Sequence, residues 1–181
     1  MQAGSALGLN VNPNKCELCL LNPQSADCLN ALDKFFELTE DVLLIQKEDL
    51  TLLGTAILPD AIENMLIPKR DELSLMAKHL AEIDKHDALF LLKNCYPIPK
   101  LTYALRTAPC FTRPDILCTY DLVIKETLLV ILNTSLQQES YWTQSTLPLN
   151  VGRLGVRLAS EIALPAYLYP VFVHRLQQHL H

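Results

Sequence analysis

No apolar run in the sequence is long enough for a membrane-spanning helix, which needs roughly 18 to 20 residues. Lys125 and Glu126 interrupt the longest apolar run, and Pro165 and Pro170 divide the last one. The first residues also lack the cationic and apolar regions of a secretory signal. The sequence therefore predicts an intracellular protein of the nucleus or cytoplasm, with no membrane partner, whose six cysteines are free thiols.

Two arrangements of catalytic residues are absent as well. No serine or cysteine lies in a glycine-flanked turn of the kind that exposes a nucleophile. No two aspartates are adjacent, so the sequence lacks an Asp-Asp pair of the kind that can hold two divalent ions for phosphoryl transfer. Asp121 follows Tyr120 within an expected helix and has no acidic neighbour, so we expect a solvated helix residue and not a metal ligand.

The cysteines offer one candidate metal site. Cys16 and Cys19 have the two-residue spacing of a zinc knuckle, and Cys28 could supply a third thiolate. A structural zinc site usually needs a second close pair, however, and the nearest histidine is His79. In a strand, positions 16 and 19 would also point to opposite faces, so we expect no metal site. The histidines near the C-terminus, which have no acidic or thiolate neighbour, are His174, His179 and His181.

The charge distribution divides the chain. Half of the 181 residues are apolar and the net charge is −5, which allows one real core and argues against a free-standing nucleic-acid binder. Residues 1–84 carry 6 cations against 14 carboxylates, whereas residues 85–113 carry 5 cations against 1 carboxylate. We call this second stretch the basic segment. Its five cations are Lys85, Lys93, Lys100, Arg106 and Arg113.

The first third of the chain has a mixed pattern. Residues 15–21 form a short apolar run between two asparagine-proline turns, which predicts a strand. Apolar spacing predicts an amphipathic helix over 26–38, N-capped by Ser25. The apolar runs 42–45 and 50–54 are separated by four polar residues, which favours a hairpin.

Helical periodicity dominates from Pro59 onward. Apolar residues at steps of three and four predict a helix between positions 62 and 83, which Pro68 should break or kink. Further helices are expected over 86–95, from Pro97 through 106, and over 115–133.

The last predicted helix is apolar on all sides at 128–132, which we expect to lie centrally in the core. A turn at 152–155 and one or two terminal helices complete the chain. The predicted fold class is α+β, mostly α, with short N-terminal β elements followed by a helical bundle. The expected domains are 1–57 and 58–181.

One ordered series of motifs resembles a known family. The decapeptide GLNVNPNKCE at 8–17, followed by Leu52, Leu53 and Gly54, resembles the stretch after the catalytic aspartates in reverse transcriptases of non-LTR retrotransposons. Arg153 stands where family members usually have a second glycine, so the turn there is expected to be altered. Further matching segments, which extend the resemblance over most of the chain, are 85–89, 94–103, 106–110, 147–148 and 154–157.

The resemblance implies that Met1 lies downstream of the polymerase active site. Residues 1–57 would then be a palm remnant ending in a primer-grip-like hairpin at Leu53 and Gly54, and residues 58–181 a thumb-like region. The full-length family uses Mg²⁺, but this chain would hold no cofactor. The missing palm and fingers segments, and weakly an RNA/DNA template-primer, would be its partners.

Each residue carried over from the family also has a structural interpretation. By the resemblance, Lys15 corresponds to a lysine that protonates the departing pyrophosphate. Without the metal-binding aspartates it would have no such role, and the structural interpretation is a lysine whose side chain points to water. Gly54 could equally end a strand at a bulge. The thumb-like cations that could track phosphates, or simply be solvated, are Lys93, Lys100 and Arg106.

Three functions remain open from the sequence. The first is a degenerate or truncated piece of an RNA-directed DNA polymerase that does not polymerise alone. The second is a helical module that binds a protein partner through the acidic N-terminal half and the apolar stripe at 60–83. The third is a weak nucleic-acid-binding remnant. Trp142, the single tryptophan, is expected to anchor packing more than to stack on bases.

Overall fold

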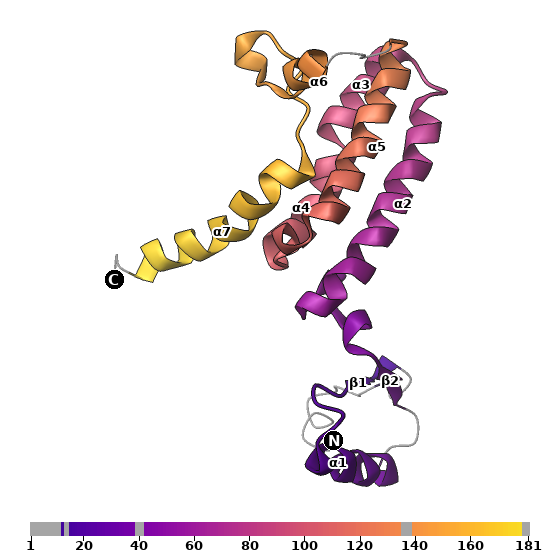
Figure 1. Cartoon of the computed structure of the whole chain (residues 1–181), viewed down its shortest axis with the longest axis vertical. Coiled ribbons are helices and arrows are strands. Elements are labelled where there is room, and N and C mark those ends of the chain that lie inside the picture. The colour runs from indigo at the N-terminus through magenta and orange to yellow at the C-terminus, as the bar shows by residue number, and fades with distance from the viewer. Residues whose placement is uncertain (1–11, 13–14, 39–41, 135–138, 179–181) are drawn as a thin grey trace. The chain divides into compact units, whose positions relative to one another are not determined.

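The computed structural model describes residue 12 and residues 15–38, 42–134 and 139–178 (Figure 1). It divides into two compact units, Met1–Leu50 and Thr51–His181, which we call the N-terminal unit and the helical unit. The described part is mostly helical with short strands near its start, so the predicted fold class is confirmed.

The N-terminal unit contains two short parallel strands. Strand β1 (Glu17–Cys19) pairs with β2 (Leu43–Ile45), and helix α1 (Ala26–Leu38) connects them. Parallel strands require a long crossover, and the segment containing α1 supplies it. The helix predicted over 26–38 is confirmed.

The hairpin expected between 42–45 and 50–54 is wrong. The edge of β2 is occupied by β1, and the backbone N–H of Leu43 donates to the carbonyl of Cys16 at 3.1 Å. The polar residues expected to form its turn instead contain a single 3₁₀ turn, Lys47–Asp49. The residues after it pair with the segment that follows them, not with β2.

That second pairing is a tight hairpin in the helical unit. Strands β3 (Thr51–Leu52) and β4 (Thr55–Ala56) are antiparallel and are joined by Leu53 and Gly54. Both turn residues have positive φ, 53° and 78° respectively, which is the pattern of a two-residue type I′ turn. A hairpin at the position implied by the family resemblance is therefore present.

The hairpin packs on helices of the helical unit. The hydroxyl groups of Thr55 and Thr107 lie 2.7 Å apart, and the N–H of Ala56 donates to the sulfur of Met65 at 3.2 Å. Ala56 is buried. The sequence placed this hairpin with residues 1–57, but the division between the compact units falls at residue 50.

After the hairpin, the described residues of the helical unit form six α-helices, joined in part by short 3₁₀ turns. The helix predicted from 62 continues through Pro68 without a break, because this proline is exposed and the missing N–H costs less on the solvent side. The next three predicted helices are confirmed to within one or two residues. The six are α2 (Ile62–Leu80), α3 (Lys85–Asn94), α4 (Pro97–Thr107), α5 (Pro114–Leu132), α6 (Glu139–Thr146) and α7 (Ala159–Gln178).

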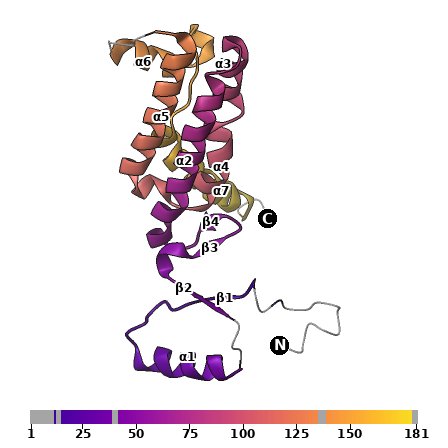
Figure 2. The same ribbon diagram turned by 90° about the vertical axis from the view of Figure 1, so that its right-hand side faces the viewer.

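The core lies where these helices meet. Helix α2 packs against α5, and the two run side by side in Figure 1 and Figure 2; α7 packs against α4 and α5. Large side chains from several helices are almost fully buried there: Ile62, Leu66, Leu92, Leu101, Leu105, Leu117, Ile124 and Leu128.

The second half of α5 differs from the expectation of a helix buried on all sides. Leu128 and Ile131 are buried, but Val130 is 59% exposed and Leu132 is 37% exposed. The buried and the exposed residues of this apolar segment therefore lie on different sides of the helix. An apolar surface therefore remains on the outer side of α5.

The turn expected at 152–155 is present. Gly152 and Gly155 have φ of 74° and 66°, and a Cβ on Gly155 would approach Cγ of Leu149 to 3.3 Å. Arg153 does not have positive φ. This position therefore accepts a side chain, and the glycine found in the family is not needed for the backbone seen here.

Candidate functional site

The residue carried over as a catalytic lysine lies at the surface. Lys15 is exposed, two positions before β1, and its backbone N–H donates to the carbonyl of Asn12 at 3.1 Å. Most of the decapeptide that suggested its role lies outside the described residues. Within the N-terminal unit, Lys15 therefore has the surroundings of a solvated lysine.

The hairpin turn exposes apolar side chains. Leu53 is 83% exposed and Leu52 is 59% exposed. A leucine rarely adopts positive φ, because its Cβ then crowds the following carbonyl. The turn thus combines backbone strain at Leu53 with an uncovered apolar surface.

The candidate phosphate-binding cations do not share one face. Lys100 and Arg106 lie six positions apart on α4, which turns them onto different sides of the helix. Arg106 lies over the ring of Tyr169 on α7, with Cζ 5.9 Å from the ring centre. On α3, Lys93 lies beside the turn containing Gly155, 3.7 Å from the position of a Cβ there.

Lys100 is the most constrained of these cations. Its ammonium lies 2.5 Å from Oε1 of Glu72 on α2 and 5.2 Å from the ring centre of Tyr96. The bond and charge of Lys100 hold the pKa of Glu72 below its usual value, so the carboxylate stays ionised. Another cation of the basic segment, Arg113, pairs with Glu63 at 3.3 Å.

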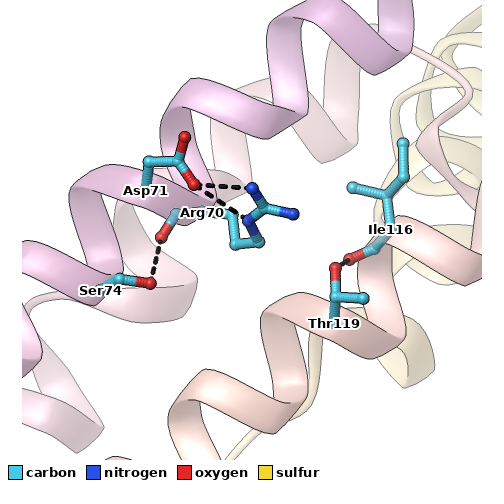
Figure 3. Close-up of polar contacts among 5 residues, drawn as sticks. All are labelled: Arg70, Asp71, Ser74, Ile116 and Thr119. Atoms are coloured by element: carbon cyan, nitrogen blue, oxygen red, sulfur yellow. Dashed lines mark hydrogen bonds and ion pairs between the residues drawn. The ribbon is translucent and has the colours of Figure 1, made fainter.

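Arg70 on α2 is also paired with a carboxylate. Figure 3 shows Arg70 joined to its neighbour Asp71, with the closest nitrogen and oxygen 2.7 Å apart. The hydroxyls of Ser74 and Thr119 donate to carbonyls of their own helices, those of Arg70 and Ile116. Each of these polar contacts stays within one helix, so none of them joins α2 to α5.

Asp121 is not the solvated residue that we expected. It is 8% exposed, and its carboxylate accepts the backbone N–H groups of Ala159 and Ser160, at 2.6 and 3.0 Å, and the hydroxyl of Ser160 at 2.5 Å. The first N–H groups of a helix have no partner within the helix. Asp121 on α5 therefore caps the start of α7.

Two opposing effects set the protonation of Asp121. Burial raises the pKa of its carboxyl, and the bonds from Ser160 and Ala159 lower it, with burial the larger effect. The sequence contained a signal for this role. Asp121 falls in the buried stripe of α5 with Leu117 and Ile124, and no Ser, Thr, Asn or Asp occupies 155–158 to cap α7 locally.

A cavity of about 220 Å³ lies among α2, α4 and α5. Tyr120 contributes to its wall and donates its hydroxyl to the carbonyl of Pro97 at 2.8 Å. Burial raises the pKa of Tyr120 far above its usual value, so the phenol remains a neutral donor. The lining residues are Lys69, Glu72, Leu73, Met76, Tyr96, Lys100, Leu101 and Tyr120.

The cysteines do not form a metal site in the part of the chain described. Cys16, Cys19 and Cys28 are free and half-buried, and no group of three or more His, Cys, Asp or Glu residues there could hold a metal ion. Cys110 is buried, which raises its pKa to about 11 and leaves it an unreactive thiol. His174 lies in α7, but its side chain is outside the described atoms, and His179 and His181 lie outside the described residues.

Trp142 is part of the packing of the helical unit. It is half-buried against the core, and the ammonium of Lys125 lies 5.6 Å from its ring centre. A cation over the ring and a core contact both reduce the ring surface available for stacking on a base.

Comparison with protein-family models, with curated proteins and with solved structures finds no match for the chain. Within residues 12–178 as described, no helix is both long and apolar enough to cross a membrane.

Proposed function

We propose that this chain derives from the reverse transcriptase of a non-LTR retrotransposon and does not polymerise nucleotides by itself. The observation that carries the proposal is the order of the motifs: the decapeptide at 8–17, Leu53 and Gly54, and the segments from 85 to 157 follow one another as in the family. In this account residues 1–57 descend from the end of the palm, and residues 58–181 from the thumb-like region.

Two features of the helical unit support the proposal. A tight hairpin turns at Leu53 and Gly54, where the family has its primer grip, and it packs directly on helices. Among the described residues, no three or more His, Cys, Asp or Glu side chains come together in a group that could hold a metal ion. Asp121, the aspartate that follows a tyrosine, caps a helix and is not available to a metal ion.

The DNA upstream of the Met1 codon tests the ancestry. The proposal predicts that this DNA encodes the palm of such a polymerase, with a Tyr-x-Asp-Asp hairpin before the glycine-leucine motif, intact or interrupted by stop codons. Upstream DNA encoding an unrelated domain in the same frame would contradict it.

A primer-extension assay tests the expected lack of activity. The purified chain, with magnesium, deoxynucleotides and an annealed RNA template and DNA primer, should extend no primer, while an active reverse transcriptase does so in the same buffer. Nucleotide incorporation that remains with the chain after repurification would contradict the proposal.

The structure favours only weak nucleic-acid binding as a present role. Lys100 and Arg113 are paired with carboxylates, which partly neutralises their charge. Arg106 keeps its charge, but its guanidinium lies over the ring of Tyr169. Fluorescence anisotropy with an RNA/DNA hybrid at low salt should therefore show little difference between the wild type and a Lys93→Gln, Lys100→Gln, Arg106→Gln variant. A large loss of affinity in that variant would instead support a phosphate-tracking thumb.

A second candidate function is a protein-interaction module. An open groove of about 400 Å³ runs between α2 and α5, and Val130 on its wall is 59% exposed. Exposed apolar surface of this kind is typical of partner-binding faces. Sedimentation that finds only monomer in a folded sample, together with no crosslinked species, would count against this function.

A further inference from the structure

The cavity among α2, α4 and α5 plays no part in the proposed ancestry, yet it combines a charged rim with an apolar floor. The charged residues that line it are Lys69, Glu72 and Lys100, which we call the rim; the side chains of Lys100 and Glu72 are 47% and 57% exposed. Its floor contains Leu73, which is 4% exposed, and Leu101, which is 1% exposed, so it extends into the core of the helical unit.

The rim favours a single negative charge. Glu72 binds Lys100 at 2.5 Å, and Lys69 lies one turn earlier on α2, close enough for its charge to lower the pKa of Glu72 further. Two cations and one carboxylate leave a net charge of +1 at this opening. An anion with one carboxylate would balance it, whereas a cation would be repelled.

The floor favours one aromatic ring. Leu73, Met76 and Leu101 offer apolar surface, and Tyr96 adds an aromatic side chain. Methionine sulfur makes favourable contacts with aromatic rings. An apolar cavity of about 150 Å³ in another protein is large enough for benzene, so about 220 Å³ admits one ring and a short substituent.

We propose that this cavity binds a small monocarboxylate that carries a single aromatic ring. The ring lies against Leu73, Met76 and Leu101, and the carboxylate lies between the ammonium groups of Lys69 and Lys100. The ligand carboxylate competes with Glu72 for Lys100. Removing the charge of Glu72 should therefore tighten binding, while removing either lysine charge should weaken it.

The probe is 3-phenylpropionate, titrated into the full chain labelled with ¹³C at its methionine methyl groups. The methyl signal of Met76, which lines the cavity, should shift with a Kd on the order of 1 mM. The signal of Met65, whose sulfur accepts the N–H of Ala56, should stay in place and serves as the internal control. No shift of Met76 well above that concentration would overturn the proposal.

Two further compounds separate the charge from the ring. The alcohol 3-phenylpropanol has the ring without the carboxylate, and propionate has the carboxylate without the ring. Each should bind at least tenfold more weakly than 3-phenylpropionate, because each loses one half of the recognition. Equal affinity for the alcohol would overturn the assigned role of the lysines.

Three substitutions of charged residues at the rim should change the affinity for 3-phenylpropionate, two of them weakening it and one strengthening it. Lys69→Gln and Lys100→Gln should each weaken binding of 3-phenylpropionate by threefold or more, and Glu72→Gln should tighten it by a similar factor. Lys78→Gln, an exposed position further along α2 outside the cavity, is the matched control and should leave the Kd unchanged. General damage to the fold cannot tighten binding, so a weaker Glu72→Gln variant would contradict the proposal. If a variant fails to fold, the wild-type ligand series decides.

Discussion

The N-terminal unit and the helical unit are built from similar local sequence patterns but differ in burial. Among residues 12–50, none of those described is buried, whereas the helical unit encloses a continuous core. Helix α1 and helix α4 have 13 and 11 residues, yet only α4 has fully buried side chains. Helix formation therefore accompanies burial in one unit and occurs without it in the other.

The reason for the difference is size. A pair of three-residue strands and one helix cannot enclose the apolar side chains they carry, so Leu29 and Leu43 remain 48% and 62% exposed. Short two-stranded sheets are marginal in water, and an open strand edge invites pairing with another chain. The described part of the N-terminal unit thus leaves apolar side chains exposed, which is compatible with the proposed descent from a palm.

The largest effect should come from truncating the core of the helical unit. Leu105 is fully buried. Leu105→Ala should lower the free energy of unfolding by about 2–5 kcal/mol, because the substitution leaves a cavity. Leu44 in β2 is 49% exposed, and its change to alanine should cost less than about 0.5 kcal/mol.

Urea denaturation followed by far-ultraviolet circular dichroism compares these two variants, since that signal registers helices of both units. Similar losses for Leu105→Ala and Leu44→Ala would show that the N-terminal unit has a core of its own, contrary to the burial described above.

Asp121 should rank second. Changing it to alanine leaves the N–H groups of Ala159 and Ser160 without their carboxylate partner, which should cost about 1–3 kcal/mol. Asp121→Asn keeps one acceptor oxygen and should cost less. An Asp121→Ala variant as stable as the wild type would show that water caps α7 equally well.

The contribution of Asp121 to stability should also depend on pH, in a direction that its raised pKa determines. Because the folded pKa of Asp121 is raised above its unfolded value of 3.8, its contribution to stability is full below pH 3.8 and declines as pH rises through the folded pKa. As the pH rises from 3.8 through the folded pKa, the stability of the wild type relative to Asp121→Asn should therefore decrease. A relative stability that rises over the same range would mean that the three hydrogen bonds outweigh burial.

A smaller effect, of opposite sign, is expected at the hairpin turn. Leu53 has φ of 53° and is 83% exposed, so changing it to asparagine relieves strain without losing packing. Asn followed by Gly is the preferred pair for this turn type, and a gain of about 0.5–1 kcal/mol should follow. Leu53→Ala keeps the strain and serves as the control; an equal gain there would contradict the strain argument.

The smallest effect is expected for the ion pair between Glu72 and Lys100, whose side chains are 57% and 47% exposed. Glu72→Gln should cost less than about 0.5 kcal/mol at neutral pH. Because the pKa of Glu72 is lowered in the folded state, its contribution is present above the unfolded value of 4.5 and is lost as pH falls through the folded pKa. High salt should abolish even this small difference between wild type and variant, as measured by thermal unfolding. A larger cost that persists in high salt would contradict the prediction.

The helices could be predicted from the sequence because their signals are local. Prolines at 97 and 114 mark helix starts, and apolar steps of three and four define α2 and α1 before any tertiary contact is considered. The two-residue turn at Leu53 and Gly54 was found only through the family resemblance, because leucine is an unusual residue for positive φ.

The errors concern contacts between distant segments. Pairing of β2 with β1 depends on a parallel crossover, which a short apolar run does not encode, so the sequence predicts pairing with the nearer segment instead. The burial of Asp121 depends on α7, which begins 38 positions later along the chain. Apolar composition at 128–132 likewise gave no information on which side would meet a neighbour.

The candidate site was only partly visible in the sequence. The charge of Lys100 marks it in the sequence, but its pairing with Glu72 and its place at a cavity depend on the packing of α4 against its neighbours. No sequence signal marks Lys69, because it lies in the acidic half of the chain, outside the basic segment.

Hydrogen exchange on the intact chain, read by mass spectrometry, tests the contrast between the two units most directly. The amides of α4 and α5 should exchange only through global unfolding, while those of β1, α1 and β2 should exchange orders of magnitude faster. Equal protection of both regions in a monomeric sample would contradict the account, because it would require a core in the N-terminal unit.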